Sequence, residues 1–284
     1  MAKIHELLGG APTTSFEFFP PKTDEEATRL EATLRELVPL SPAFVSVTYR
    51  GGAESRQRTF DLVTRLATEG HLVAMAHLIC VAHSRGELVD ILTRYREAGI
   101  ENLMALGGDP PEDPSAAPGE LNYASELVAL AREVGDFSIG VAAHPAGHPR
   151  SRSLAEDRDR LAEKLEAADF AVTQFFFEAA DWQGLVADLA ERGVHKPVLP
   201  GIMPVTNLRS VPRMAQMGAA LPGDLVARLE SANADGGAEA VRAEGIAHAT
   251  ELCRELLAMG APGVHLYTLN ASAATREIAE SLAR

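Results

Sequence analysis

Cysteine is scarce in this sequence, which has only Cys80 and Cys253 among its 284 residues. Both lie in apolar surroundings and neither belongs to a CxxC motif, so we expect two buried thiols in a reducing compartment and no disulfide framework. Long apolar runs are missing too. Nowhere do about 18 apolar residues follow one another, and residues 1–14 lack the apolar core of a signal peptide. We therefore expect a soluble, cytoplasmic protein.

Positively charged residues are also few compared with negatively charged ones. The 26 Lys and Arg residues stand against 40 Asp and Glu residues, which gives a formal net charge of −14. A chain of this sign is not expected to have nucleic acid or an anionic membrane as its main partner. The negative net charge does not exclude a small-molecule substrate, because the local charge of a binding site can be opposite in sign to that of the whole chain. The apolar fraction of 46% is typical of a protein with a sizeable core.

Short apolar runs alternate with amphipathic stretches along the whole chain, which predicts alternating strands and helices. The expected strands are 15–19, 44–48, 72–79, 102–106, 138–143, 171–177, 198–202 and 264–269. The expected helices are 24–38, 55–69, 84–98, 123–134, 154–167, 181–192, 208–217 and 272–282. Plausible N-caps stand at Thr23, Ser84 and Asn207, and glycines close three helices at Gly70, Gly99 and Gly193.

Eight strand–helix units in register predict a (β/α)8 barrel of the TIM type, with a doubly wound open sheet as the alternative. Two additional helices, at 223–232 and 237–259, precede the last strand and indicate an insertion in the seventh loop. No linker, low-complexity segment or internal repeat interrupts the pattern, so we expect one domain over residues 1–284. In such a barrel the catalytic groups lie at the carboxyl ends of the strands.

The first expected strand carries a carboxylate inside an aromatic run, SFEFFPP at 15–21. Burying the Glu17 carboxylate costs several kcal/mol unless it is paired, hydrated or protonated. A carboxyl group that holds a proton near neutral pH can act as a general acid. The alternative is an edge strand whose glutamate points into water. Polar residues and glycines also end the other strands, as at Thr48, Gly107, Gln174 and Asn270, and this clustering favours an enclosed site.

Seven sequence blocks carry a resemblance, in the same order and over nearly the whole chain, to methylenetetrahydrofolate reductases. The blocks are SFEFFPPKT (15–23), FVSVTY (44–49), AHLIC (76–80), LGGD (106–109), TQFFF (173–177), PGIMPVTN (200–207) and HLYTLN (265–270). The resemblance implies a (β/α)8 barrel that reduces 5,10-methylenetetrahydrofolate to 5-methyltetrahydrofolate, a step of one-carbon metabolism and methionine biosynthesis. In most members NAD(P)H first reduces a bound FAD, which then passes the hydride to the folate.

By this resemblance Glu17 protonates the folate as its methylene bridge opens to an iminium ion, and Asp109 is the carboxylate that stabilises the cation. The chemistry agrees, since an iminium forms only when a proton is donated and positive charge is stabilised. The expected substrate-binding residues are Thr48, Gln174, Met214 and Tyr267. The expected cofactor-binding residues are His77, Gly107, Gly108, His144, His148 and Lys164.

Several positions depart from the family where other members hold FAD. Gly107 replaces an arginine, residues 144–146 read His-Pro-Ala instead of Tyr-Pro-Glu, and the helix at 156–164 is rather acidic. The charged run at 155–164 is interpreted as a solvated outer face. Each lost charge-assisted contact to a pyrophosphate costs about 1.5–3 kcal/mol. We therefore expect that FAD is bound weakly or not at all and that NADH or NADPH delivers its hydride directly to the folate. Compensation by Arg152 or Arg160 would instead give the FAD-dependent form.

Two other classes stay open as alternatives: a folate-binding protein without turnover, and a barrel lyase that uses Glu17 as a base. His144 and His148 suggest a metal, but no third ligand stands near them in the sequence. Because Pro145 and Pro149 also prevent a helical HxxxH face, no metal site is predicted. The sequence leaves open the choice of NADH or NADPH, the preference for polyglutamate tails, and whether the protein is a monomer or a homo-oligomer.

Overall fold

The strands of the chain form one continuous parallel sheet. The computed structural model describes residues 2–49, 53–109 and 119–283. Within them, nine strands pair in the order β7-β6-β5-β4-β3-β2-β1-β9-β8. The strands are β1 (Thr13–Phe18), β2 (Phe44–Val47), β3 (Ala74–Ile79), β4 (Asn102–Leu106), β5 (Ser138–Ala143), β6 (Phe170–Thr173), β7 (Val198–Leu199), β8 (Gly201–Ile202) and β9 (Gly263–Tyr267).

The two ends of this sheet lie next to each other in the chain, because β7 and β8 are pieces of one extended segment. Pro200 separates them and has no N–H to donate to a ladder, so β7 pairs with β6 and β8 pairs with β9. The eight expected strands are therefore present, the seventh in two pieces. The nearly closed barrel confirms the predicted (β/α)8 fold and excludes the open sheet.

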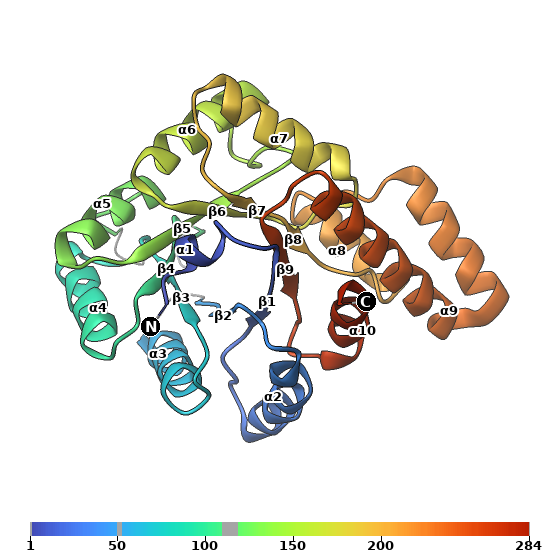
Figure 1. Cartoon of the computed structure of the whole chain (residues 1–284), viewed down its shortest axis with the longest axis horizontal. Coiled ribbons are helices and arrows are strands. Elements are labelled where there is room, and N and C mark those ends of the chain that lie inside the picture. Colours follow the sequence, from blue (N-terminus) through green and yellow to red (C-terminus); the bar gives the residue numbers. More distant parts are fainter. Residues whose placement is uncertain (1, 50–52, 110–118, 284) are drawn as a thin grey trace.

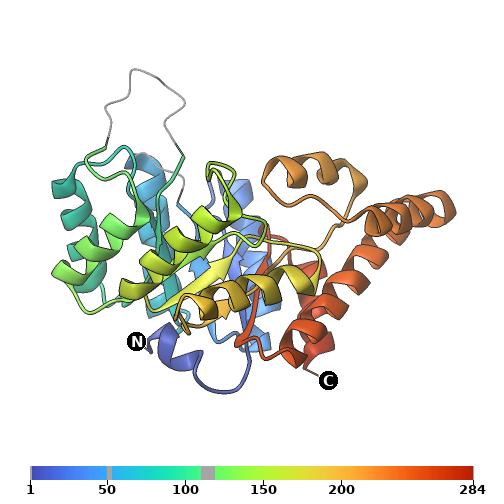
Figure 2. The same ribbon diagram turned by 90° about the horizontal axis from the view of Figure 1, so that it is seen from above.

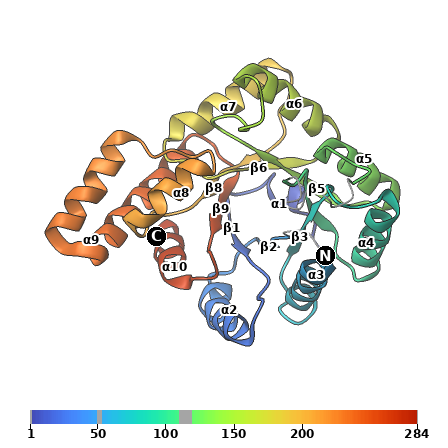
Figure 3. The ribbon, with the colours of Figure 1, turned by 180° about the vertical axis from the view of Figure 1, so that it is seen from behind.

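Helices surround the barrel on its outside (Figure 1, and from the opposite side in Figure 3). Thr23, Ser84 and Asn207 each accept a hydrogen bond from the backbone N–H three residues later, at 3.2, 3.2 and 3.0 Å, which confirms them as N-caps. The helices are α1 (Ile4–Leu7), α2 (Asp24–Leu37), α3 (Ala53–Thr68), α4 (Arg85–Glu97), α5 (Ala124–Val134), α6 (Leu154–Ala167), α7 (Ala179–Glu191), α8 (Val211–Gln216), α9 (Gly223–Ala258) and α10 (Ser272–Leu282), with 3₁₀ turns at Val38–Leu40 and Leu208–Ser210.

Several expected elements differ in their extent. The strand expected at 171–177 ends at Thr173, and the helix expected at 208–217 begins as a 3₁₀ turn. The two helices expected before the last strand are joined in α9, which breaks its helical geometry at Gly237, with φ 65° and ψ −150°. Such a conformation is open to glycine and strained for other residues. The break therefore exists close to its predicted position.

Helix α1, for which the sequence carried no signal, closes the amino-terminal end of the barrel. Figure 2 shows it beneath the strands, next to the amino terminus. Ile4 and Leu8 are buried in one cluster with Phe44 and Phe170, and the Ile4 N–H donates to Asn102 Oδ1 at 2.8 Å. A four-residue helix is too short to produce a periodic apolar pattern. With this end sealed by apolar side chains, access to the interior is left at the carboxyl ends of the strands.

Helix α9 extends away from the barrel and returns to it (Figure 2). On its return, Gly245 lies against the loop after β8, where a Cβ atom would stand 1.8 Å from the Val205 carbonyl oxygen. Only glycine permits this approach, which holds α9 against the apolar cluster that contains Val205, Met203 and Met214. Among the described helices, including this one of 36 residues, none has the length and apolar character needed to cross a membrane.

Both cysteines are free and buried, as predicted. Burial raises the pKa of the Cys80 thiol to about 11 and that of Cys253 to about 12. The Cys80 thiol donates to the Gly107 carbonyl oxygen at 3.3 Å. Both groups are therefore protonated, unreactive thiols of the core.

Candidate active site

Glu17 lies inside the barrel, not on an edge that faces water. Its residue is 9% exposed, and β1 is flanked by β2 and β9, with Glu17 in register with Ser46 and Tyr267. Its Oε2 atom is 3.5 Å from His77 Nε2 and 3.9 Å from His265 Nε2. The neighbouring Phe16 and Phe18 point the other way, into the core under the helices. Glu17 is thus an enclosed carboxyl group between two imidazole rings near the carboxyl ends of the strands.

His265 forms the floor of this site, and sequence reasoning missed it. Its Nδ1 lies 2.8 Å from Ser15 Oγ and its Nε2 lies 3.1 Å from Ser46 Oγ. Ser15 Oγ also donates to the Val264 carbonyl oxygen at 3.2 Å, so it is free to accept from Nδ1–H. The available signal was alternation, because His265 and Tyr267 are two residues apart and share one face of β9. These bonds fix the ring beneath Glu17.

Two buried polar atoms beside Glu17 have no hydrogen-bond partner among the described residues: His77 Nε2 and Thr48 Oγ1. Burial lowers the pKa of His77, and the charge of His265 acts in the same direction while that of Glu17 opposes it. His77 is therefore neutral at pH 7 and supplies no positive charge to Glu17. Buried polar groups are normally satisfied, so both atoms are candidates to meet a polar group of a bound ligand.

Three of the expected substrate-binding residues, Tyr267, Gln174 and Met214, lie near the carboxyl ends of β6 and β9 and close to Phe175. The Tyr267 hydroxyl donates to the Thr173 carbonyl oxygen at 2.6 Å, and burial raises its pKa well above the usual value. The Gln174 side chain accepts from the Phe175 N–H at 3.0 Å. Met214 is only 5% exposed and packs in the same cluster as Phe175. Tyr267 and Gln174 are thus held by the backbone near the site, and Met214 is packed in the neighbouring apolar cluster.

The loop after β4 carries Gly107, Gly108 and Asp109. Gly108 has φ +87°, and a Cβ atom there would stand 2.6 Å from Val81 Cγ2, so this position requires glycine. Its carbonyl oxygen accepts from Arg150 Nη2 at 3.3 Å, which links this loop to the loop after β5. Asp109 is exposed. The structure therefore leaves the Asp109 carboxylate accessible at the carboxyl end of the barrel.

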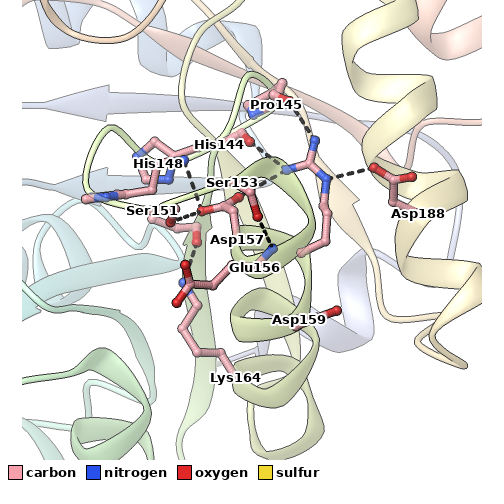
Figure 4. A network of polar contacts seen from close by, with 12 residues as sticks. His144, Pro145, His148, Ser151, Ser153, Glu156, Asp157, Asp159, Lys164 and Asp188 are labelled. Atoms are coloured by element: carbon pink, nitrogen blue, oxygen red, sulfur yellow. Dashed lines mark hydrogen bonds and ion pairs between the residues drawn. The ribbon is translucent and has the colours of Figure 1, made fainter.

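The other expected cofactor-binding residues, His144, His148 and Lys164, lie together beside the loop after β5 (Figure 4). The two imidazole rings contact edge to face at 4.7 Å between centroids. Burial, with His148 and Lys164 nearby, lowers the pKa of His144 to about 4, and burial likewise lowers the pKa of Lys164. The Lys164 ammonium donates to the Ala142 carbonyl oxygen at 2.9 Å. Among the described residues, no group of three ligands suited to a metal occurs here or elsewhere.

Arg158 and Asp157 overturn the expectation that this helix presents only a solvated face. Arg158 is 2% exposed and binds Asp157 at 3.1 Å and Asp188 at 3.0 Å. It also donates to the carbonyl oxygens of His144 and Pro145, at 2.9 and 2.6 Å. Asp157 in turn accepts from the His148 N–H and the Ser151 hydroxyl (Figure 4). The pair fastens the loop that carries the two histidines.

Fold and site together describe a barrel enzyme with an enclosed carboxyl group at the carboxyl ends of its strands. The family model for methylenetetrahydrofolate reductase matches residues 3–283. The chain belongs to this family, as its sequence blocks predicted, and it is accordingly an oxidoreductase.

Similar proteins agree with that assignment. The chain is 34% identical to a 5,10-methylenetetrahydrofolate reductase of Pectobacterium carotovorum, covering 97% of this chain and 91% of that one. It is 35% identical to methylenetetrahydrofolate reductase (NADH) 1 of Arabidopsis thaliana, covering 92% of this chain and 46% of the longer plant protein. A solved structure from Clostridium thermocellum, described as binding 5-methyl-5,6,7,8-tetrahydrofolic acid, has a TM-score of 0.72 at 13% identity over 99% and 98% of the two chains. That likeness concerns the fold alone.

Proposed function

We propose that this protein reduces 5,10-methylenetetrahydrofolate to 5-methyltetrahydrofolate, and that NADH transfers its hydride directly to the folate without a tightly bound flavin. Membership of the family supports the reaction, and the names of the plant relatives support NADH as the donor. The observation that carries the proposal is Glu17, a carboxyl group enclosed in the barrel mouth with no Lys or Arg among its closest described neighbours.

The proposed reaction begins with proton transfer from Glu17. The proton goes to the folate nitrogen that leaves the methylene bridge, the carbon–nitrogen bond breaks, and the remaining nitrogen forms an iminium with the methylene carbon. A hydride from the nicotinamide C4 then adds to that carbon with both electrons of its bond, which yields the methyl group and NAD⁺. The ionised Glu17 recovers a proton from solvent, so charge and atoms balance.

Other residues stabilise and orient the reactants in this proposal. The accessible Asp109 carboxylate stabilises the iminium cation from the loop after β4. Thr48 and His77 offer their unpartnered polar atoms to the ligand beside Glu17. The Tyr267 phenol, whose raised pKa keeps it neutral, and Gln174 contribute further polar groups at the carboxyl ends of β9 and β6. Holding the donor carbon and the iminium carbon in contact supplies the remaining rate enhancement.

Most of the cationic side chains near the loop after β5 already bind other groups of the protein, including Arg150, which donates to the Gly108 carbonyl oxygen at 3.3 Å. Arg158 is buried and its guanidinium already donates to protein groups such as the Pro145 carbonyl oxygen. The Lys164 ammonium donates to the Ala142 carbonyl oxygen. The two residues expected to compensate are exposed and paired: Arg152 lies 3.9 Å from Glu156, and Arg160 lies 3.1 Å from Glu163. Their side chains are 91% and 67% exposed, so a contact from either to a diphosphate is screened by solvent and contributes little. This supports direct hydride transfer, and no step here is assigned to FAD.

The test is a visible spectrum and an activity trace on one preparation purified without added flavin. We expect no flavin bands and steady oxidation of NADH that depends on methylenetetrahydrofolate, unchanged by added FAD. A rate that rises many-fold with FAD would establish the flavin-dependent form of the same reductase. Folate binding without NADH oxidation under both conditions would establish the catalytically silent alternative.

A further inference from the structure

A cavity of about 400 Å³ opens beside the site, between the carboxyl ends of β1 and β2 and the helices that follow them. Its walls include Phe19, Thr48, Leu269 and Asn270. The Asn270 amide clamps the backbone of Phe19, accepting from its N–H at 2.8 Å and donating to its carbonyl oxygen at 2.9 Å. This wall is therefore rigid, and it continues the strand that carries Glu17.

The charge of this cavity opposes that of the whole protein. Among the residues that the structure describes, its lining has the cations Lys22, Arg29 and Arg58 and one carboxylate, Glu26. Glu26 already accepts from the backbone N–H of Lys22 at 2.7 Å. Three cations at one cavity of a chain with net charge −14 concentrate positive potential where an anion can enter.

The lining also contains donors that are poorly satisfied within the protein. Arg58 Nε and Thr48 Oγ1 are buried atoms without hydrogen-bond partners among the described residues, and Thr48 as a whole is only 9% exposed. Arg29 pairs with Glu25 at 3.2 Å, and Arg58 with Glu54, each across one turn of a helix. The Arg29 pair is exposed and therefore weak, so it can exchange for an anion held by several cations, whereas the Arg58 side chain is only 25% exposed. Both observations make the cavity suited to an anionic ligand.

We propose that this cavity binds the anionic end of one of the two substrates: the glutamyl carboxylates of the folate, or the phosphates of the nicotinamide dinucleotide. The proposal rests on the proposed function, because it assumes that the reacting end of the same molecule lies at Glu17. Leu269, which is 57% exposed, and Pro20 supply apolar surface along the path between the two ends. Lys22 and Arg29 are the flexible outer contacts, and Arg58 is the inner one.

The test is equilibrium binding to the double variant Lys22→Gln/Arg29→Gln, with Arg254→Gln as the matched control. Arg254 is an exposed arginine of α9 with a carboxylate neighbour, remote from the cavity in sequence and element. The probes are NADH, and tetrahydrofolate with one or three glutamates. We expect the double variant to bind one of these two substrate types about 5- to 20-fold more weakly, with the loss shrinking in high salt.

The outcomes separate the sources and the two proposals. A loss for the folates, larger for the triglutamate, assigns the cavity to the carboxylates, whereas a loss for NADH assigns it to the phosphates. If the double variant binds both substrate types as tightly as Arg254→Gln does, the proposed role of the cavity is wrong, even if the enzyme turns over normally. Unaltered protein that binds the probes but oxidises no NADH overturns the proposed function and leaves the cavity standing. Melting temperatures confirm that every variant is folded.

Discussion

Replacing Glu17 with Gln is expected to lower kcat by about 10²–10⁴-fold, the usual contribution of a general acid. The amide matches the carboxyl group in shape, but it is too weak an acid to transfer a proton to the leaving nitrogen. Because Glu17 contacts His77 and His265 only at 3.5 and 3.9 Å, the structure around it has little reason to change. Steady-state oxidation of NADH with methylenetetrahydrofolate measures the effect.

The control for this variant is Glu230→Gln, which makes the same chemical change on the exposed surface of α9. It should retain full activity. Both variants should bind NADH with unchanged affinity and melt within a few degrees of the unaltered protein. A near-normal kcat for Glu17→Gln would show that Glu17 is not the general acid of the reaction.

Replacing Arg158 with Met should have the largest effect on stability, lowering the free energy of unfolding by about 3–5 kcal/mol. The substitution keeps much of the side-chain volume but strips Asp157, Asp188 and two backbone carbonyls of their donor. Asp157 is itself buried, so its charge would lose its cationic partner and keep only the hydrogen bonds from the His148 N–H and the Ser151 hydroxyl. Denaturant unfolding followed by circular dichroism measures the loss.

Arg160→Met is the matched control, because Arg160 lies two residues away on the same helix with its side chain 67% exposed. Its effect should stay within about 0.5 kcal/mol. If Arg158→Met also cost less than about 1 kcal/mol, the buried pair would not be what fastens the loop after β5. Adding Asp157→Asn to Arg158→Met should recover part of the loss, since it removes the unpaired charge.

The strands were predictable because a parallel strand inside a barrel is covered on both faces and reads as a continuous apolar run. The strands at 102–106 and 138–143 have the predicted bounds for this reason. The break at Pro200 and the early end at Thr173 depend on pairing partners, which a single sequence does not specify. Helix α1 was missed because four residues hold no period, although it seals the barrel.

The enclosed position of Glu17 was foreseeable, since one carboxylate among aromatic residues is a local anomaly. No local feature of the sequence singles out His265, because its ring is positioned by Ser15 and Ser46, which lie on two other strands. Arg158 was misread as part of a charged outer face. One helix turn exposes some charged residues and buries others, and only the position of the β5 loop decides that Arg158 and Asp157 turn inward. The catalytic and binding roles assigned to Glu17, Asp109 and the other site residues stay predictions.

The central claim is that Glu17 prepares the folate for a hydride that arrives from NADH without an intermediate carrier. A reduced flavin would hold that hydrogen on a nitrogen that exchanges with water, whereas a hydrogen passed between two carbons cannot exchange. The most direct measurement is therefore single-turnover reduction with NADH deuterated at the transferring position of C4, followed by mass spectrometry of the methyl group. We predict that the deuterium is retained in 5-methyltetrahydrofolate. Its loss to solvent in protein that carries a flavin would contradict direct transfer.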